Sequence, residues 1–298
     1  METASIPPSQ NQSTSKTSAL AIASLVCGIL GLCLLLPSLL GGIFGIIALI
    51  KINKSNGALK GSGFAIAGLA TSALSIVTVG ILASMLLPAL ARAKAKANRI
   101  KCVNNLGSIG KSLFGFADMN SQRLPWQLTE SQQANHSFNN PGIGAGSAAQ
   151  VVNIAAMRSE LQTPKILVSP SDPERMAANE MLQGNWKAAS ETDIAAGLSY
   201  VFAAPGGDVQ RPSTVLALTR NIRTDLNSDW IGADESGAEM NPNVMWGLNK
   251  SQGQLVLADG SAKQSSNADL GMNGAITKDH VNSGGGQSLG NASTAVLR

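Results

Sequence analysis

The sequence predicts an α+β fold in which a two-helix transmembrane unit comes first and its second helix continues as a long helix packed on a small antiparallel sheet. Three observations lead to this expectation. Charged residues make up 13% of the 298 residues, against roughly 25% in soluble globular domains. The deficit is concentrated in two uncharged N-terminal runs. Beyond them, the chain carries a helical apolar stripe and then several short strand-like segments.

The two uncharged runs cover residues 17–50 and 64–91, and each exceeds the roughly 20 apolar residues that a helix needs to cross a bilayer. They predict a membrane domain over 17–91, with spans at about 18–50 and 64–90. Pro37, with Gly41 and Gly42 after it, lies where the first span could kink or break, and a kinked or tilted span is expected. Residues 1–16 are polar and are expected to be disordered, and they lack the basic start of a cleavable signal peptide.

Small residues recur along both spans and predict surfaces on which the two helices pack closely. The alternative interpretation is that these residues are lipid-facing spacers. The residues in question are Ala21, Gly28, Gly31, Gly42, Gly45, Ala48, Ala65, Gly68 and Ala73.

Basic residues give conflicting evidence on topology. Lys51, Lys54 and Lys60 lie between the spans, and the positive-inside rule would place this 51–63 loop in the cytoplasm and both chain ends outside. However, five basic residues also follow the second span and favour the cytoplasmic side for that end. They are Arg92, Lys94, Lys96, Arg99 and Lys101. Charge alone therefore leaves the orientation undecided.

The segment after the second span reads as one continuous amphipathic helix. Apolar residues recur at three- and four-residue steps from Leu86 to Phe116. Pro88 removes one backbone donor, so we expect a mild kink there and not a stop, and the helix should end near 118–121. Arg92, Lys96 and Arg99 share one side at helical spacing, which would suit acidic lipid headgroups or an ordinary solvated face.

The remaining part predicts a small antiparallel sheet with flanking helices. A hairpin turn at Asp259-Gly260 is expected within the last strand pair, because this dipeptide tolerates positive backbone dihedrals. Helices are expected at 145–162 and 173–183, and polar loops or a loose tail at 131–150, 227–243 and 282–294. Strands are expected at 164–169, 198–204, 214–219 and 254–264.

The sequence offers little support for an active site. Both histidines, His136 and His280, lie in polar loop or tail sequence and are expected to be surface residues. The "GIGAG" segment at 142–146 lacks the strand and Lys-Ser/Thr of a phosphate-binding loop. An acidic cluster could hold calcium through oxygen ligands or simply be solvated; it comprises Asp229, Asp234, Glu235 and Glu239. No catalytic, cofactor-binding or metal-binding residue is assigned, no cofactor is expected, and no nucleic acid is expected as a partner because aromatic residues do not interleave with the lysines.

Three segments resemble pseudopilin-like proteins related to type II secretion and type IV pili, of the planctomycete and verrucomicrobial type. They are "ILASMLLPALARAKAKANRIKCVNNLGSIGKSLFGFADMN" (81–120), "LQTPKILVSPSDPERM" (161–176) and "GQLVLADGSAKQ" (253–264). The resemblance implies a long helix and an extracytoplasmic α+β head over 81–298. It also implies a multi-pass protein of the inner (cytoplasmic) bacterial membrane with a cytoplasmic 51–63 loop. Other pilin-like subunits or secretion-apparatus proteins would be partners besides the lipid bilayer.

The N-terminal part resembles a different family, a small two-helix membrane domain of unknown function, in "ALAIASLVCGILG" and "GALKGSGFAIAGLATSALS". The chain therefore looks like a fusion. Gly63-Phe64 resembles a prepilin cleavage site, but no carboxylate follows between Lys60 and Asn98, where the family pattern requires a glutamate. The resemblance then implies that neither peptidase processing nor standard fibre assembly should be assumed.

Relatives often carry a cysteine at the position of Ser169, which would give Cys102 a disulfide partner. Without it, Cys102 is expected to be a free thiol buried under the helix. Cys27 and Cys33 lie in the first span, where they should act as small apolar residues.

These observations favour a non-enzymatic, integral-membrane, pseudopilin-like component of a secretion or pilus-like apparatus. The alternative is a membrane-anchored extracytoplasmic binding or sensory module that does not polymerise.

Overall fold

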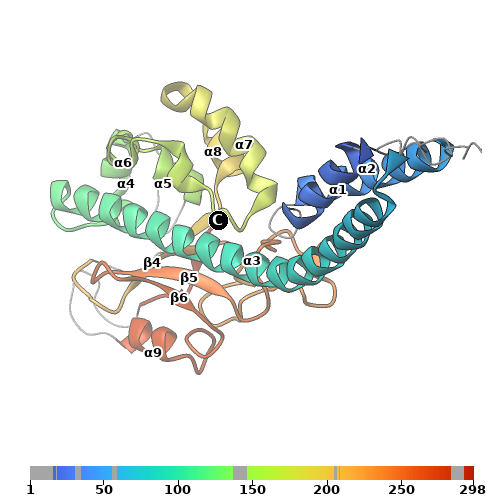
Figure 1. Ribbon diagram of the computed structural model, residues 1–298. Helices are drawn as coiled ribbons and strands as arrows, with labels where there is room; N and C mark the ends of the chain where they lie inside the picture. Colours follow the sequence, from blue (N-terminus) through green and yellow to red (C-terminus); the bar gives the residue numbers. More distant parts are fainter. Residues whose placement is uncertain are drawn as a thin grey trace, which may run out of the picture. The chain divides into compact units, whose positions relative to one another are not determined.

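The computed structural model divides into two compact units, Met1–Arg92 and Ala93–Arg298, which share the long helix α3, Ser62–Met119 (Figure 1). The expected disorder of residues 1–16 lies outside the described residues, apart from Lys16. The structure describes residues 16–17, 19–30, 35–55, 59–136, 146–204, 207, 209–282 and 292–298.

The first unit contains three helices instead of the two that were expected. Helix α1 covers Ala19–Leu30 and helix α2 covers Leu35–Lys54, and the two pack along one another. The prediction of one kinked span over 18–50 is therefore wrong. Pro37 lies in the first turn of α2, where its missing N–H costs no helical hydrogen bond. A short parallel pair of strands, β1 (Lys16–Thr17) and β2 (Leu59–Lys60), precedes α1 and α3.

Helix α3 continues through Pro88 and ends at Met119, as expected. Its C-terminal end is fixed by the backbone, because Ser121 and Gln122 both adopt positive φ angles of 56° and 62°. Such a conformation cannot continue a right-handed helix.

The second unit, Ala93–Arg298, is the head of the molecule, and it is built on a five-stranded antiparallel sheet in the order β6-β5-β4-β3-β7. One row of paired residues crosses the whole sheet, through Leu297, Phe202, Ala217, Val256 and Ala262. The strands are β3 (Tyr200–Ala203), β4 (Val215–Thr219), β5 (Gly253–Leu257), β6 (Ala262–Ser265) and β7 (Val296–Leu297).

The three central strands are buried on both faces. On one face, the C-terminal part of α3 packs through its apolar stripe, including Ile109 and Phe116, and Gly110 admits the side chain of Val256 to within 2.8 Å of the position a Cβ would take. On the other face lies a second apolar cluster that includes Trp230, together with helix α9 (Ala275–Asn282). The expected packing of the long helix on the sheet is confirmed.

The strands predicted at 198–204, 214–219 and 254–264 are confirmed, including a hairpin turn in which Gly260 has φ of 83°. The strand predicted at 164–169 is wrong: Pro164–Leu167 form a 3-10 helix, with the Thr163 side chain accepting a hydrogen bond from the Lys165 N–H.

Helix α7, Pro173–Gly184, confirms the helix expected at 173–183, and it packs on α8, Glu191–Gly197. The helix expected at 145–162 is broken at Ile154, whose extended ψ of 132° separates α5 (Ala148–Asn153) from α6 (Ala155–Leu161).

The loop expected at 131–150 instead contains α4, Glu130–Asn135, and the start of α5. The loop expected at 227–243 holds a single 3-10 turn, Ala238–Met240. Of the tail expected at 282–294, residues 283–291 lie outside the described part. Two further 3-10 turns are Pro125–Gln127 and Trp186–Ala188.

Candidate functional site

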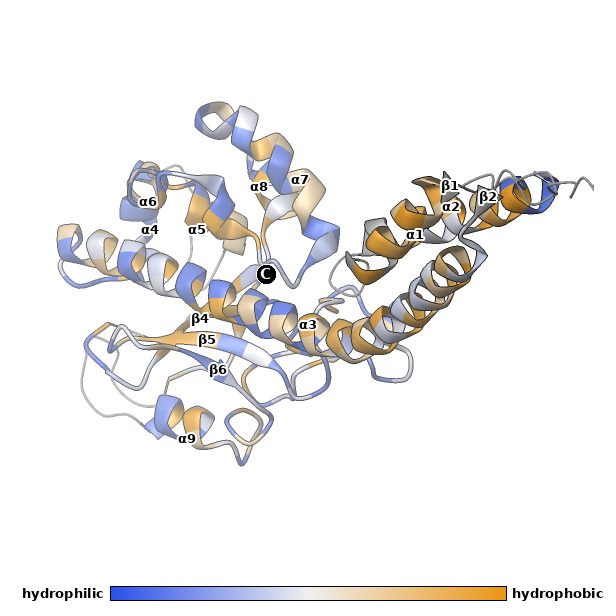
Figure 2. Ribbon diagram, viewed as in Figure 1, coloured by the Kyte–Doolittle hydropathy of each residue, from blue (hydrophilic) through white to orange (hydrophobic). Residues whose placement is uncertain are grey.

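The first unit buries its small residues and exposes its large aliphatic ones. Ala21, Ala48 and Ala65 are fully buried together, whereas Met85, Leu86 and Leu90 are 65–70% exposed. Figure 2 shows the three helices of this unit coloured as hydrophobic along most of their length. A water-soluble bundle would bury its large side chains, whereas membrane helices approach one another through small ones. This surface is the candidate functional site of the first unit.

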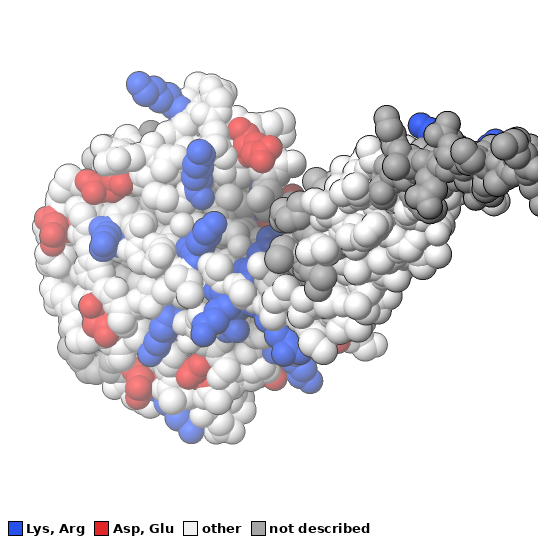
Figure 3. All heavy atoms as spheres, in the orientation of Figure 1, with Lys and Arg blue, Asp and Glu red and all other residues white. Residues whose placement is uncertain are grey.

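Within the described residues, one helix, α3, is long and apolar enough to cross a membrane. On the face shown in Figure 3, the described atoms of the first unit around α3 are almost all uncharged. A soluble protein rarely exposes a contiguous apolar surface of this kind, so membrane association follows from the composition and packing of α3.

The predicted small-residue packing is confirmed at several positions. A Cβ at Gly68 would lie 2.5 Å from Ser24 Oγ, and one at Gly45 would lie 3.3 Å from the Ala65 carbonyl oxygen. Ala73 is an exception, because it is exposed. Gly28 and Gly31 lie outside the residues whose packing is described.

Several basic side chains lie on α3 just after residue 93, where the second unit begins. Lys94, Lys96 and Lys101 are exposed, and Lys and Arg side chains gather along the middle of α3 in Figure 3. Arg99 differs, because it is partly buried beside a hollow that Lys250 also lines. Burial lowers the pKa of Arg99, although the nearby Cys102 raises it. Of the three residues expected to face either acidic lipid headgroups or solvent, Arg92 and Lys96 are exposed and Arg99 is not.

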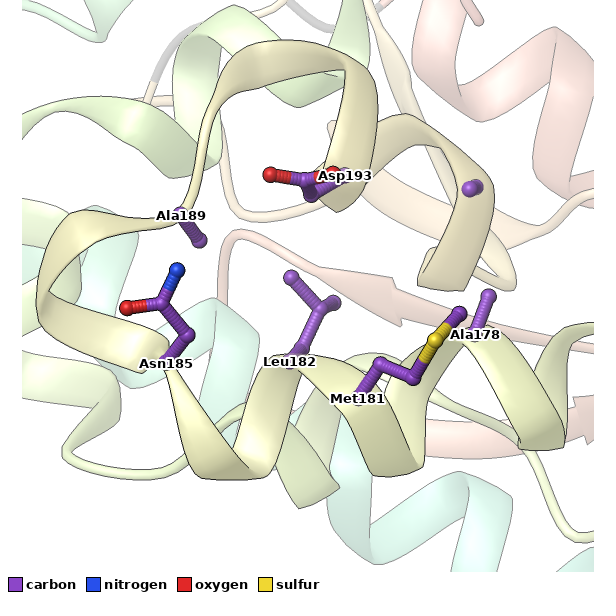
Figure 4. A pocket seen from close by; sticks show the side chains of 7 residues that line it. Ala178, Met181, Leu182, Asn185, Ala189 and Asp193 are labelled. Carbon is purple, nitrogen blue, oxygen red and sulfur yellow. The ribbon is translucent and has the colours of Figure 1, made fainter.

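A hollow of about 170 Å³ lies between α7 and α8 (Figure 4). Asp193 is its one titratable lining side chain, and its carboxylate accepts hydrogen bonds from Ser190 N–H and Oγ at 2.9 and 2.7 Å. These bonds lower the pKa of Asp193 and cap α8. The hollow therefore brings together no acid–base pair. Its other lining residues are Ala178, Met181, Leu182, Asn185, Ala189 and Ala196.

A buried ion pair connects the Pro-Ser-Asp turn to the sheet. Arg220 Nε and Nη2 donate to the two oxygens of Asp172 at 2.7 and 2.8 Å, and both residues are nearly inaccessible. Glu174 accepts from Arg220 at 2.9 Å and from the Trp246 indole at 2.6 Å. Every charged oxygen and nitrogen of the pair has a partner, so the arrangement fixes loops in place. No local pattern in the sequence predicts this pair, since residues 172 and 220 lie in separate segments.

Cys102 is a free, buried thiol, as expected. Its Sγ lies 2.7 Å from Ser169 Oγ and 3.9 Å from Ser171 Oγ. Burial raises the pKa of the thiol, outweighing the hydrogen bonds from these serines, so the fold favours its protonated form.

The prediction that both histidines are surface residues is wrong for His280. This side chain is fully buried on α9, where Nδ1 accepts from the Val215 N–H at 3.0 Å and Nε2 donates to the Ser293 carbonyl oxygen at 2.8 Å. His136 is half-buried, with its ring 5.2 Å from that of Phe116. The two imidazoles thus serve as packing and hydrogen-bonding groups.

The carboxylates of the acidic cluster at 229–239 do not converge on one point, and two of them bind nearby groups instead. Asp234 accepts from the Lys250 N–H, and Glu235 pairs with Arg223 at 3.0 Å. In the part of the chain that the structure describes, no three His, Cys, Asp or Glu side chains are placed to share a metal ion. The "GIGAG" segment lies outside the described residues except for Gly146.

Comparison with known families finds one match. A family described as a domain of unknown function (DUF4190) matches residues 20–82, which cover α1, α2 and the first third of α3. This is the region whose sequence resembles a small membrane domain of unknown function. No curated protein and no solved structure matches the chain. The pseudopilin resemblance of residues 81–298 remains a prediction.

Proposed function

We propose that this chain is a non-enzymatic integral-membrane protein of the bacterial inner membrane. It displays its α+β head outside the cytoplasm as a pseudopilin-like structural or interaction component of a secretion or pilus-like apparatus. Its partners would be the lipid bilayer and other pilin-like subunits or apparatus proteins.

The observation that carries this proposal is the 58-residue helix α3. Its first part is apolar and largely exposed, and its last part is the buried spine of the head. Between Ile81 and Leu90 every residue except Ala83 is exposed. That segment is open to lipid or to a neighbouring apolar helix, which is the contact a bundled fibre requires.

A second candidate is a membrane-anchored binding or sensory module that does not polymerise. The observation that favours it is the packing of α3 on α1 and α2 through Ala65 and Gly68. These contacts occupy the start of α3, where a pilin-like subunit would contact its neighbours. The missing carboxylate between Lys60 and Asn98 points the same way.

Membrane fractionation followed by immunogold labelling and copurification separates these candidates. Assembly predicts labelled fibres, or recovery with secretion-apparatus proteins after mild detergent extraction. A diffuse monomeric membrane protein supports the anchored module. Recovery in the soluble fraction would contradict both.

A further inference from the structure

We infer that helices α1 and α2 form a re-entrant hairpin that enters the bilayer and returns to the same side, so that α3 is the single crossing. The N-terminus then lies on the same side as the 51–63 loop and opposite the head. This inference rests on the proposed membrane location, and it reverses the expectation that both chain ends lie outside.

The contacts within the first unit fix the directions of its helices. Ser24, early in α1, meets Gly68, early in α3, and Lys16 pairs with Leu59 just before these helices begin. Helices α1 and α3 therefore start together and run in parallel.

Helix α2 runs the opposite way. Its Gly45 faces Ala65 and Leu69 of α3, whereas the earlier Gly42 faces the later Ser72. Residue numbers fall along α2 as they rise along α3, so the two helices are antiparallel. Because α1 is parallel to α3, α1 and α2 must be antiparallel to each other, and their ends at Ala19 and Lys54 lie at the same end of the unit.

Helix length shows how far the hairpin extends. The 12 residues of α1 span about 18 Å, short of the roughly 30 Å hydrocarbon core. Since Ser24 is level with Gly68, the end of α1 is level with about residue 74 of α3 at equal rise per residue. The uncharged part of α3 continues to Ala91, about 25 Å further.

Helix α2 reaches further than α1, because its 20 residues span about 30 Å. Since Gly42 is level with Ser72, the first residue of α2 is level with about residue 79 of α3, and the uncharged part of α3 continues about 18 Å beyond that level. The hairpin therefore ends well short of the far side of the crossing.

The lysines at the end of α2 show that the hairpin returns to the side of the 51–63 loop. Lys51 and Lys54 are exposed in the last turn of α2, and the 18 residues from Thr17 to Leu34 carry no charge. Lysines next to a membrane segment favour the cytoplasmic side, but the five basic residues that follow the crossing favour that side for their own end, so the orientation is taken from the proposed function. The N-terminal residues before Lys16 should therefore be cytoplasmic, while the second unit, Ala93–Arg298, is outside.

Single-cysteine labelling of the full chain tests this arrangement. In a background carrying Cys27→Ala, Cys33→Ala and Cys102→Ser, cysteine is introduced as Ser5→Cys, Asn56→Cys or Glu180→Cys. Spheroplasts are treated with a membrane-impermeant maleimide before and after permeabilisation. We expect Glu180→Cys to react at once, and the other two to gain at least tenfold in labelling on permeabilisation.

Reaction of Ser5→Cys together with Glu180→Cys, while Asn56→Cys is protected, would overturn the hairpin and restore a single span over 18–50. Protection of Glu180→Cys alone would leave the hairpin standing and contradict the orientation in the proposed function. Equal labelling of all three would contradict the crossing by α3, and with it both proposals.

The unmodified protein provides a second measurement that does not depend on the variants. In inside-out vesicles, trypsin should cleave both after Lys16 and within the 51–63 loop. In spheroplasts both regions should resist. Cleavage after Lys16 in spheroplasts with an intact loop would again contradict the hairpin.

Discussion

At the scale of single residues, His280 is the clearest case in which the fold gives a side chain a role that its sequence context hides. Its neighbours in sequence are polar, yet the ring is buried between β4 and the segment before β7. Burial lowers the pKa of His280 below its ordinary 6.5, the hydrogen bond to Ser293 raises it, and the positive charge of Arg211 lowers it. The net shift is downward, so the folded head favours the neutral ring.

The head should therefore lose stability in mild acid. The unfolded chain takes up a proton at His280 near pH 6.5, whereas the folded head resists it, so the contribution is complete above this pH and declines as the pH falls below it. All four tryptophans lie in the head, so tryptophan fluorescence of the detergent-solubilised chain reports its melting temperature. The decline between pH 6.5 and 5 should be smaller in His280→Gln and unchanged in His136→Gln. An identical decline in both variants would contradict this assignment.

Cys102 and Ser169 are placed so that a disulfide could replace their present contact of 2.7 Å. We expect Ser169→Cys to form this bond under oxidising conditions. Closing a loop between residues separated by 67 positions in the sequence should stabilise the head by about 4 kcal/mol.

The gain is measured as the difference in fluorescence melting temperature with and without reductant. Ser169→Cys combined with Cys102→Ser is the matched control and should show no difference. A wild-type-like response of the single variant to reductant would show that the two side chains do not approach each other as described.

At the scale of elements, the sequence predicted the helices and strands whose own residues carry a periodic pattern or a turn signal. The strands 198–204 and 214–219, the hairpin at 254–264 and the helix at 173–183 all carry their own periodicity or turn signal, and all are confirmed. The error at 164–169 has the opposite origin. That apolar segment has strand-like composition, but Pro164 supplies no hydrogen-bond donor and favours a tight 3-10 turn.

Two short helices that were not predicted begin with a recognisable sequence signal. Helix α4 begins with a capping box between Thr129 and Gln132, and α8 with one between Ser190 and Asp193. Both fit the pattern of a hydroxyl residue followed three positions later by a side-chain acceptor. Strand β7 has only two residues, so its pairing depends on β3 and could not be inferred from its own sequence.

The hairpin between β5 and β6 offers a test of one element. Gly260 has φ of 83°, a region that is strongly unfavourable for β-branched side chains, although a Cβ there would meet no other atom within 4 Å. Gly260→Val should therefore destabilise the head by about 1–3 kcal/mol through backbone strain alone. Gly260→Asn is the control and should cost less, because asparagine tolerates this conformation. Equal fluorescence melting temperatures for the two variants would contradict the turn.

At the scale of the whole molecule, composition alone separated an apolar N-terminal unit from a polar head. The number of helices in the first unit was not predictable in the same way. A run of uncharged residues shows that a segment avoids water. It does not show whether that segment forms one long helix or two short ones, because both arrangements remove the same residues from water. What distinguishes them is the contact of Ser24 with Gly68 and of Gly45 with Ala65, which joins residues far apart in the sequence. The buried pair of Asp172 and Arg220 escaped prediction for the same reason.

These contacts also bear on whether the N-terminal segment is removed. A peptidase acting at Gly63-Phe64 would remove α1 and α2 and leave Ala65 and Gly68 without the helices that now cover them. Membrane helices are held together by such close packing and not by a difference in polarity from lipid, so no apolar substitute restores the lost contacts. The segment after the bond also lacks the carboxylate that could pair with a new amino terminus in lipid. We therefore expect α1 and α2 to remain attached.

Intact-mass measurement of the protein extracted from its native membrane decides this last prediction. A dominant species near 30.6 kDa is expected, with Gly68→Leu as a companion variant. Because a Cβ at Gly68 would approach the Ser24 backbone to 2.7 Å, that change should loosen the hairpin from α3. It should therefore increase proteolysis of the 51–63 loop without altering the fluorescence melting of the head. A dominant wild-type species that begins at Phe64 would instead mean that the hairpin is a removable leader, and the pseudopilin interpretation would then apply without the anchor.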